Sequence, residues 1–119
     1  NDGFYEPELN SYRWTRQIAS LFVEVPQGYS QIKIKLNTMN PDVARWPVKV
    51  GLYLAGRRVM ELHLQDQGVT EVSGKIEERL RPGLTELKLV VDRTFVPRDQ
   101  GMDEDARELG IAVHKIEIS

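Results

Sequence analysis

The most decisive absence in this sequence of 119 residues is that of cysteine. Without a thiol the chain forms no disulfide, holds no metal through a thiolate and uses no cysteine nucleophile. The lack of disulfides favours a reducing compartment such as the cytoplasm. Many secreted β-domains lack disulfides too, so the location stays open.

Long apolar runs are also missing. No stretch approaches the ~20 residues that a membrane-spanning helix needs, and no signal-peptide pattern is visible. We therefore expect no direct membrane insertion. Because the chain begins with Asn1 rather than Met, we expect it to be excised from a larger protein.

An excess of charge of either sign is lacking as well. The chain has 16 Lys and Arg residues against 18 Asp and Glu residues, so its formal net charge is −2. Binders of nucleic acid or of anionic membranes normally carry a basic excess or stripe, so we expect neither partner. Hydrophobic residues make up 40% of the chain, which is typical of a globular protein. The length allows one domain, over residues 1–119.

What the sequence does contain is a series of short segments in which apolar and polar residues alternate. This pattern predicts strands with one buried face, around 12–15, 19–25, 32–36, 48–54, 60–64 and 87–91. Segment 69–80 has helical composition, but Pro82 ends it too early for a stable helix, so we expect strand and loop there. About eight strands and no long helix predict an all-β protein, an antiparallel β-sandwich or barrel.

The last strand changes its apolar register. Leu109, Ile111 and Val113 share one parity, whereas Ile116 and Ile118 have the other. Such a change predicts a β-bulge near His114 and Lys115. Since the apolar pattern continues to the penultimate residue, we expect this strand to be held inside a sheet.

Signatures of catalysis are missing. There is no Gly-rich phosphate loop, nucleophile elbow or His-Glu-x-x-His motif. His63 should face away from the core, and for both His63 and His114 we expect a solvated or hydrogen-bonded imidazole. A glycoside hydrolase needs two carboxylates across a cleft, which a domain of this size rarely builds. We expect a protein that is not an enzyme and needs no cofactor.

The segment before the last strand is rich in carboxylates, which could bind calcium through oxygen ligands. Their spacing does not match the helix-loop-helix calcium pattern, and Arg98 and Arg107 lie among them. We therefore favour a solvated loop with local ion pairs over a metal site. The carboxylates are those of Asp99, Asp103, Glu104, Asp105 and Glu108.

Four aromatic residues could form a platform on which sugar faces stack: Tyr5, Trp14, Trp46 and Tyr53. The alternative is that Trp14 and Trp46 serve core or edge packing. Trp46 and Tyr53 are the better surface candidates, because Trp46 falls in a loop and Tyr53 opposes the apolar parity of its strand.

Two stretches resemble a known family. Gly3-Phe4-Tyr5 with Glu8, then Tyr12-Arg13-Trp14-Thr15, resemble the opening of β-sandwich modules attached to bacterial glycosyltransferases that build cell-surface polysaccharides. Asp105-Ala106-Arg107-Glu108-Leu109-Gly110-Ile111-Ala112-Val113, with Phe95-Val96-Pro97 ahead of it, resembles their end. This chain departs by a longer acidic insertion, 98–104.

The resemblance implies a jelly-roll, galactose-binding-domain-like fold in which Arg13, Trp14, Asp105 and Arg107 act together. They could contact a ligand, or they could lock the sandwich through Arg107–Glu8 and Arg13–Asp105 ion pairs. We favour the role of these residues in holding the sandwich together over a role in sugar binding.

The functional hypothesis is a non-catalytic carbohydrate-binding-like accessory module of a bacterial glycosyltransferase or related glycan-handling protein. Its partners would be a saccharide and other domains of the parent protein. The alternative is a structural or interaction domain that docks on a partner domain or dimerises. The candidate ligand contacts are Tyr5, Arg13, Trp14, Trp46, Tyr53, Asp105 and Arg107.

Overall fold

The computed structural model describes residues 2–8, 12–77 and 79–119. In this part of the chain eight strands and one short 3₁₀-helix form, and all strand pairs are antiparallel. The elements are β1 (Asp2–Phe4), β2 (Arg13–Val25), β3 (Gln31–Asn37), β4 (Val48–Leu54), β5 (Arg57–Leu64), β6 (Thr70–Lys75), β7 (Gly83–Val91), η1 (Pro97–Gln100) and β8 (Ala112–Ile118).

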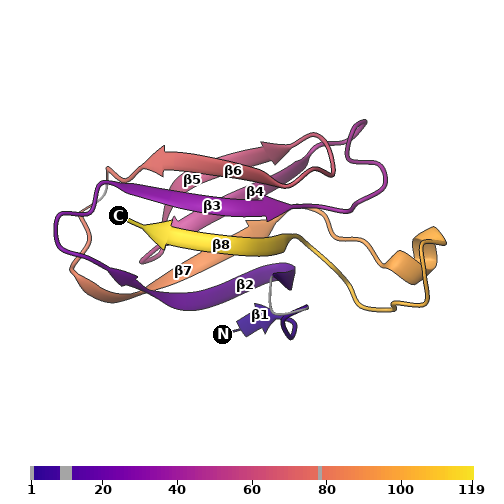
Figure 1. Cartoon of the computed structure of the whole chain (residues 1–119), viewed down its shortest axis with the longest axis horizontal. Helices are drawn as coiled ribbons and strands as arrows, with labels where there is room; N and C mark the ends of the chain where they lie inside the picture. Colours follow the sequence, from indigo (N-terminus) through magenta and orange to yellow (C-terminus); the bar gives the residue numbers. More distant parts are fainter. Residues whose placement is uncertain (1, 9–11, 78) are drawn as a thin grey trace.

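The strands pack as two layers joined through β2 (Figure 1). One layer has the order β5-β4-β7-β2, with β1 beside β2. The other has the order β8-β3-β6 and receives the first residues of β2. This is the antiparallel β-sandwich that the alternating sequence pattern predicts.

The core lies between the layers and uses the predicted strand faces. Side chains with 0% exposure include Ile32, Ile34, Leu36, Val50, Leu52, Leu87, Leu89 and Ile111. Burying each such side chain stabilises the fold by about 1.5–3 kcal/mol relative to leaving it exposed. The predicted outward direction of His63 is confirmed, because its side chain is exposed.

Strand β2 is longer than the sequence pattern indicates. The two expected segments, 12–15 and 19–25, are one strand of 13 residues. Arg13 and Trp14 pair with β8, whereas Ile18 to Val25 pair with β7. The buried parity changes along β2 because the strand passes from one layer to the other.

Residues 2–8 form an N-terminal arm that lies on the domain; residues 1 and 9–11 lie outside the described part. Asp2 pairs with Ser20 and Phe4 with Thr15. Gly3 has a φ of +78°, and a Cβ there would overlap the Ile18 carbonyl oxygen. Only glycine allows the arm to lie this close to β2.

Strand β8 confirms both predictions made for it. Lys35 pairs with Lys115 and Leu36 with Val113, so His114 is the extra residue of a bulge. β8 lies between β2 and β3, and is therefore held inside a sheet.

Segment 69–80 is strand and loop, as predicted, with Glu78 outside the described residues. β6 covers Thr70 to Lys75, and Ile76 follows it into the core. In the described ranges no helix has the length and apolarity to cross a membrane.

Candidate functional site

Strand β2 meets the segment that leads into β8 in a closed end, formed by Trp14, Thr15, Phe95, Leu109 and Gly110. Trp14 is only 8% exposed, and its ring meets Phe95 edge-on with 6.0 Å between centroids. Leu109 and Ala112 complete this second apolar cluster. Trp14 therefore serves as a packing residue of this cluster, and its assignment as a ligand contact stays a prediction.

Backbone contacts fix the closed end. The Thr15 amide donates to the Ile111 carbonyl at 2.8 Å, and the Ile111 amide donates to Thr15 Oγ1 at 3.1 Å. The Gly110 amide donates to the Thr15 carbonyl at 2.7 Å, and a Cβ on Gly110 would lie 2.6 Å from the Arg16 carbonyl oxygen. Gly110 and Ile111 of the closing motif thus allow the segment before β8 to lie close to the backbone of β2.

Arg107 ties the closing loop to the N-terminal arm. Its Nη2 donates to Asp105 Oδ2 at 2.7 Å and to Glu8 Oε1 at 3.0 Å, and its Nε donates to Asp105 Oδ1 at 3.0 Å. The hydrogen bond from Arg107 lowers the pKa of Asp105, and the same bond raises the pKa of Arg107. The predicted Arg107–Glu8 pair is confirmed.

The predicted Arg13–Asp105 pair is wrong. Asp105 is already occupied by Arg107, and Arg13 Nε donates to the Tyr5 carbonyl at 2.8 Å instead. The Arg13 guanidinium lies 5.2 Å from the centre of the Phe4 ring. Arg13 therefore anchors the arm through Phe4 and Tyr5 rather than through Asp105.

Tyr5 lies between two guanidinium groups. Arg107 and Arg16 are 5.0 Å and 5.2 Å from the centre of its ring, which is within cation–π range. Its hydroxyl donates to the Glu108 carbonyl at 2.9 Å. The structure thus brings together Tyr5, Asp105 and Arg107: Arg107 bonds to Asp105 and lies over the Tyr5 ring, while the Tyr5 hydroxyl bonds to Glu108.

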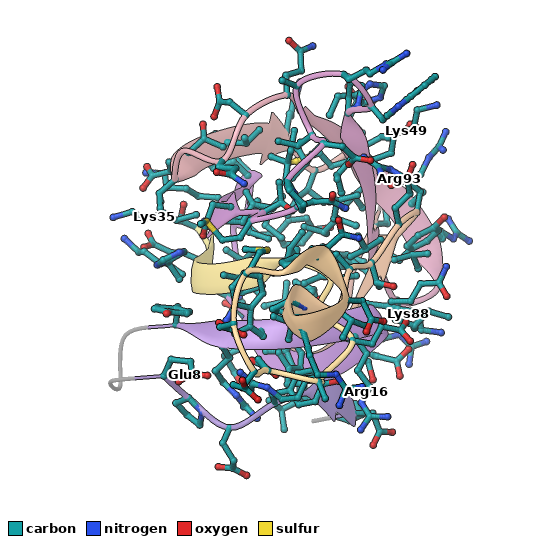
Figure 2. The ribbon with its side chains drawn as sticks, turned by 90° about the vertical axis from the view of Figure 1, so that its right-hand side faces the viewer. Glu8, Arg16, Lys35, Lys49, Lys88 and Arg93 are labelled. Atoms are coloured by element: carbon teal, nitrogen blue, oxygen red, sulfur yellow. The ribbon has the colours of Figure 1, made fainter. Side chains whose placement is uncertain are left out.

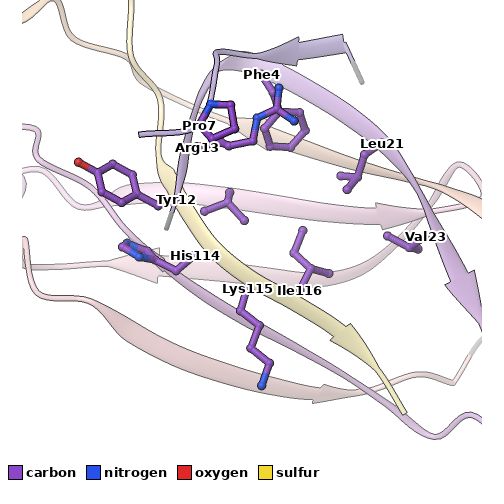
Figure 3. Close-up of a pocket in the computed structure, with 10 residues that line it drawn as sticks. Phe4, Pro7, Tyr12, Arg13, Leu21, Val23, His114, Lys115 and Ile116 are labelled. Carbon is purple, nitrogen blue, oxygen red and sulfur yellow. The ribbon is translucent and has the colours of Figure 1, made fainter. Parts of the chain in front are cut away.

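Beyond the closed end, β2 and β8 separate and leave a groove (Figure 3). β2 continues along β7 while β8 continues along β3. The groove has a volume of about 370 Å³. Its walls are Leu21 and Val23 from β2 and Val113 and Ile116 from β8, and its remaining lining is Phe4, Pro7, Tyr12, Arg13, His114 and Lys115.

Tyr12 and His114 form the aromatic part of the groove, and Figure 3 draws them side by side. Their ring centroids are 5.0 Å apart and the planes meet at 36°. His114 Nε2 lies 2.8 Å from Asn37 Oδ1, which fixes the orientation of the imidazole. Burial, and then the charge of Lys35, lower the pKa of His114. Both effects favour the neutral form of the imidazole.

Trp46 and Tyr53 lie elsewhere. Trp46 is 57% exposed in the loop before β4, its carbonyl accepts a hydrogen bond from Arg93, and Arg45 lies 5.6 Å from its ring centre. Tyr53 lies over Gly51 and lines a shallow depression of about 160 Å³. Neither residue lines the groove, so the candidate aromatic platform is not one surface.

Sequence reasoning named only Arg13 among the residues that line the groove. Tyr12, His114 and Lys115 were missed as binding candidates because a groove depends on where two strands part. The available signal was the pair of register changes, one in 12–19 and one at 113–116, which mark where β2 leaves β8 and where β8 bulges.

Within the ranges 2–8, 12–77 and 79–119, no group of three or more His, Asp or Glu residues is placed to hold a metal ion. The carboxylates of the acidic segment are spread along the chain. Asp99 lies near Arg98, and Asp105 near Arg107. The arrangement over these residues is one of local ion pairs.

The fold is similar to that of solved sugar-binding proteins. The C-terminal domain of EclA, a sugar-binding protein, has a TM-score of 0.54 and 14% identity over 87% of this chain and 67% of that one. The carbohydrate-binding module CBM36, solved with calcium and xylotriose, has a TM-score of 0.54 and 18% identity over 86% and 72%. A family 35 carbohydrate-binding module from an environmental isolate has a TM-score of 0.50 and 14% identity over 100% and 74%.

No protein-family model and no curated protein matches the sequence. At these identities the structural likeness establishes the fold. It confirms the predicted all-β, galactose-binding-domain-like β-sandwich, in the form found in carbohydrate-binding modules.

Proposed function

We propose that this chain is a non-catalytic carbohydrate-binding accessory module of a bacterial glycosyltransferase or related glycan-handling protein. The fold likeness supports the carbohydrate part. The resemblance of the motifs at both ends of the chain supports the glycosyltransferase part.

The groove is the observation that carries this proposal. A sugar ring has apolar C–H faces and a rim of hydroxyls. The groove offers apolar walls from Leu21, Val23 and Val113, with polar groups of Tyr12 and His114 at one end. Its volume of about 370 Å³ falls in the range of small-ligand sites.

We choose the proposed contacts by the exposure of each side chain and by whether its polar groups are already bonded within the protein. Tyr12 supplies the stacking ring and Arg13 supplies donors at the end of the groove. Trp46 and Tyr53 are proposed as separate, secondary stacking positions. Tyr5, Asp105 and Arg107 hold the closed end together, so we propose that they support the site rather than touch the sugar.

A titration followed by NMR tests the proposal. Binding on a shallow groove desolvates little area, so we expect dissociation constants of about micromolar to millimolar for bacterial polysaccharide fragments. Amide shifts should cluster on β8 and the start of β2. Tyr12→Ala should weaken binding about tenfold or more, and Trp46→Ala serves as the matched aromatic control.

Two results would count against this site. Shifts that cluster around Trp46, and disappear in Trp46→Ala, would move the site to that loop. A broad glycan panel that moves no resonance would remove the saccharide proposal altogether.

The alternative is a docking or dimerising domain, and one surface favours it. Ile18, Phe22 and Leu84 are 55%, 65% and 72% exposed on the outer face of β2 and β7. Phe22 pairs with Glu86 and Glu24 with Leu84, so Phe22 and Leu84 are diagonal neighbours. Exposed apolar residues gathered in this way mark contact surfaces.

Sedimentation velocity tests the alternative. A dimer that Phe22→Ser converts to monomer, in a protein that binds no glycan, would favour docking over saccharide binding. A monomer at all concentrations, with no association with domains of the parent protein, would remove the alternative.

A further inference from the structure

The groove is positively charged in a chain whose formal net charge is −2. Among the described residues that line it, Arg13 and Lys115 are cationic, His114 can become so, and none carries a carboxylate. Because the chain has more acidic than basic residues overall, this one-sided lining is a local property of the groove.

The pairing of β3 with β8 adds a further positive charge. Lys35 lies directly opposite Lys115. Like charges in directly opposed positions destabilise a sheet. Lys35 makes no ion pair with a described carboxylate, whereas Lys115 contacts Glu117 at 3.1 Å in a half-exposed pair. A pair of that kind is weak and exchanges readily for another anion.

The positive charge of Lys35 acts on a residue that lines the groove. The positive charge of Lys35 is one of the two causes that lower the pKa of His114, after burial. On β2, the hydrogen bond from Arg13 Nε to the Tyr5 carbonyl holds the guanidinium against Phe4. The groove is therefore lined by positive charge from β2, at Arg13, and from β8, at Lys115.

We infer that the groove takes an acidic saccharide, with the sugar ring against Tyr12 and the apolar walls and its anionic group near Arg13 and Lys115. This inference rests on the proposed function and specifies its ligand class. Guanidinium and ammonium groups bind carboxylates through charge-assisted hydrogen bonds. An anionic group on the sugar would make an attraction to Arg13 and Lys115 that a neutral sugar cannot make.

The test compares two probes of equal length, tetragalacturonate and the neutral tetramer of galactose, at matched ionic strength. We expect the acidic tetramer to bind at least about tenfold more tightly, with an affinity that falls as salt is added. Lys115→Gln and Lys35→Gln should each weaken acidic binding by about three- to tenfold. Lys35 does not line the groove, so Lys35→Gln should leave neutral binding unchanged.

Lys49→Gln is the matched control, because it removes the same charge from an exposed lysine of β4. Figure 2 shows Lys35 on one side of the molecule and Lys49 and Lys88 on the other. This variant should bind the acidic tetramer as the unchanged protein does. Equal losses in all three variants would indicate a response to net charge and would overturn the inference.

The remaining outcomes separate the inference from the proposed function. Equal binding of both tetramers in the groove would overturn the acidic specificity and leave saccharide binding in place. Sodium sulfate producing the same shifts as tetragalacturonate would reduce the site to a simple anion site and overturn the inference. Binding of neither these tetramers nor any other glycan would overturn both.

Discussion

The contact between the first and last parts of the chain has two regions of opposite character. At the closed end, Thr15, Gly110 and Ile111 exchange backbone hydrogen bonds over a buried Trp14. A few residues further along, β2 and β8 have no pairing with each other, and partly exposed Val113 and Ile116 line the groove.

In our proposal, this difference separates residues that stabilise the fold from residues that bind a ligand. The closed end engages its polar groups internally, so it offers few donors or acceptors to a ligand. The groove leaves apolar walls and basic groups accessible to solvent. The motifs at the two ends of the chain therefore hold the closed end together, and the divergence of β2 from β8 leaves the groove that we propose as the binding site.

The largest change in stability is expected for a substitution that disrupts the closed end. Trp14→Ala removes the ring that packs on Phe95, so we expect a loss of about 3–5 kcal/mol in the free energy of unfolding. Tyr12→Ala, in the neighbouring groove, should cost less than about half as much because Tyr12 is only partly buried. Urea melts measure both losses. Equal losses would remove the distinction between the two regions.

The next effect concerns the ion pairs of Arg107. Arg107→Gln should cost about 1 kcal/mol at neutral pH, since the side chain is partly exposed and solvent screens its bonds. The pKa of Asp105 is lower in the folded protein. The bond therefore contributes fully above the unfolded value of about 3.9 and is lost as the pH falls through the folded value.

Thermal melts between neutral and strongly acidic pH check this linkage. The difference between the unchanged protein and Arg107→Gln should shrink below about pH 4. Arg98→Gln, whose pair with Asp99 is long at 3.9 Å, is the control and should change little at any pH. A difference that is constant with pH would show that Asp105 is not the partner that matters.

How far the sequence predicts this molecule depends on the range of the interactions. The alternation of apolar and polar residues predicts the buried faces of β3, β4 and β7. It does so because successive side chains of a strand point to opposite faces, whatever lies beside the strand. The parity change at 113–116 predicted the bulge at His114. The passage of β2 between layers was not predicted, since it depends on which strands lie beside it.

The candidate site was less predictable for the same reason. The pair Arg107–Glu8 follows from two motifs that end up side by side. The pair Arg13–Asp105 does not form, because Arg107 reaches Asp105 from two residues away and occupies both oxygens. The burial of Trp14 could not be predicted from alternation, since Trp14 and its neighbour Thr15 are both buried. Competition between two side chains for one partner cannot be recognised from the spacing of residues along the sequence.

The smallest expected effect concerns calcium. Asp103 and Asp105 accept hydrogen bonds from the backbone of their own loop. We expect the melting temperature to be the same in millimolar calcium and in chelator. A site occupied only in the folded protein would add stability by mass action, so a rise of several degrees with calcium would place a metal in the acidic segment.

The groove itself is tested most directly by contacts between sugar protons and side-chain methyl groups. In a complex with a bound oligosaccharide, we expect intermolecular nuclear Overhauser effects to the methyl groups of Val23 and Val113, on opposite walls. Contacts to the Trp46 indole or to Leu84 instead, with none to the two valines, would contradict the assignment of the groove as the binding site.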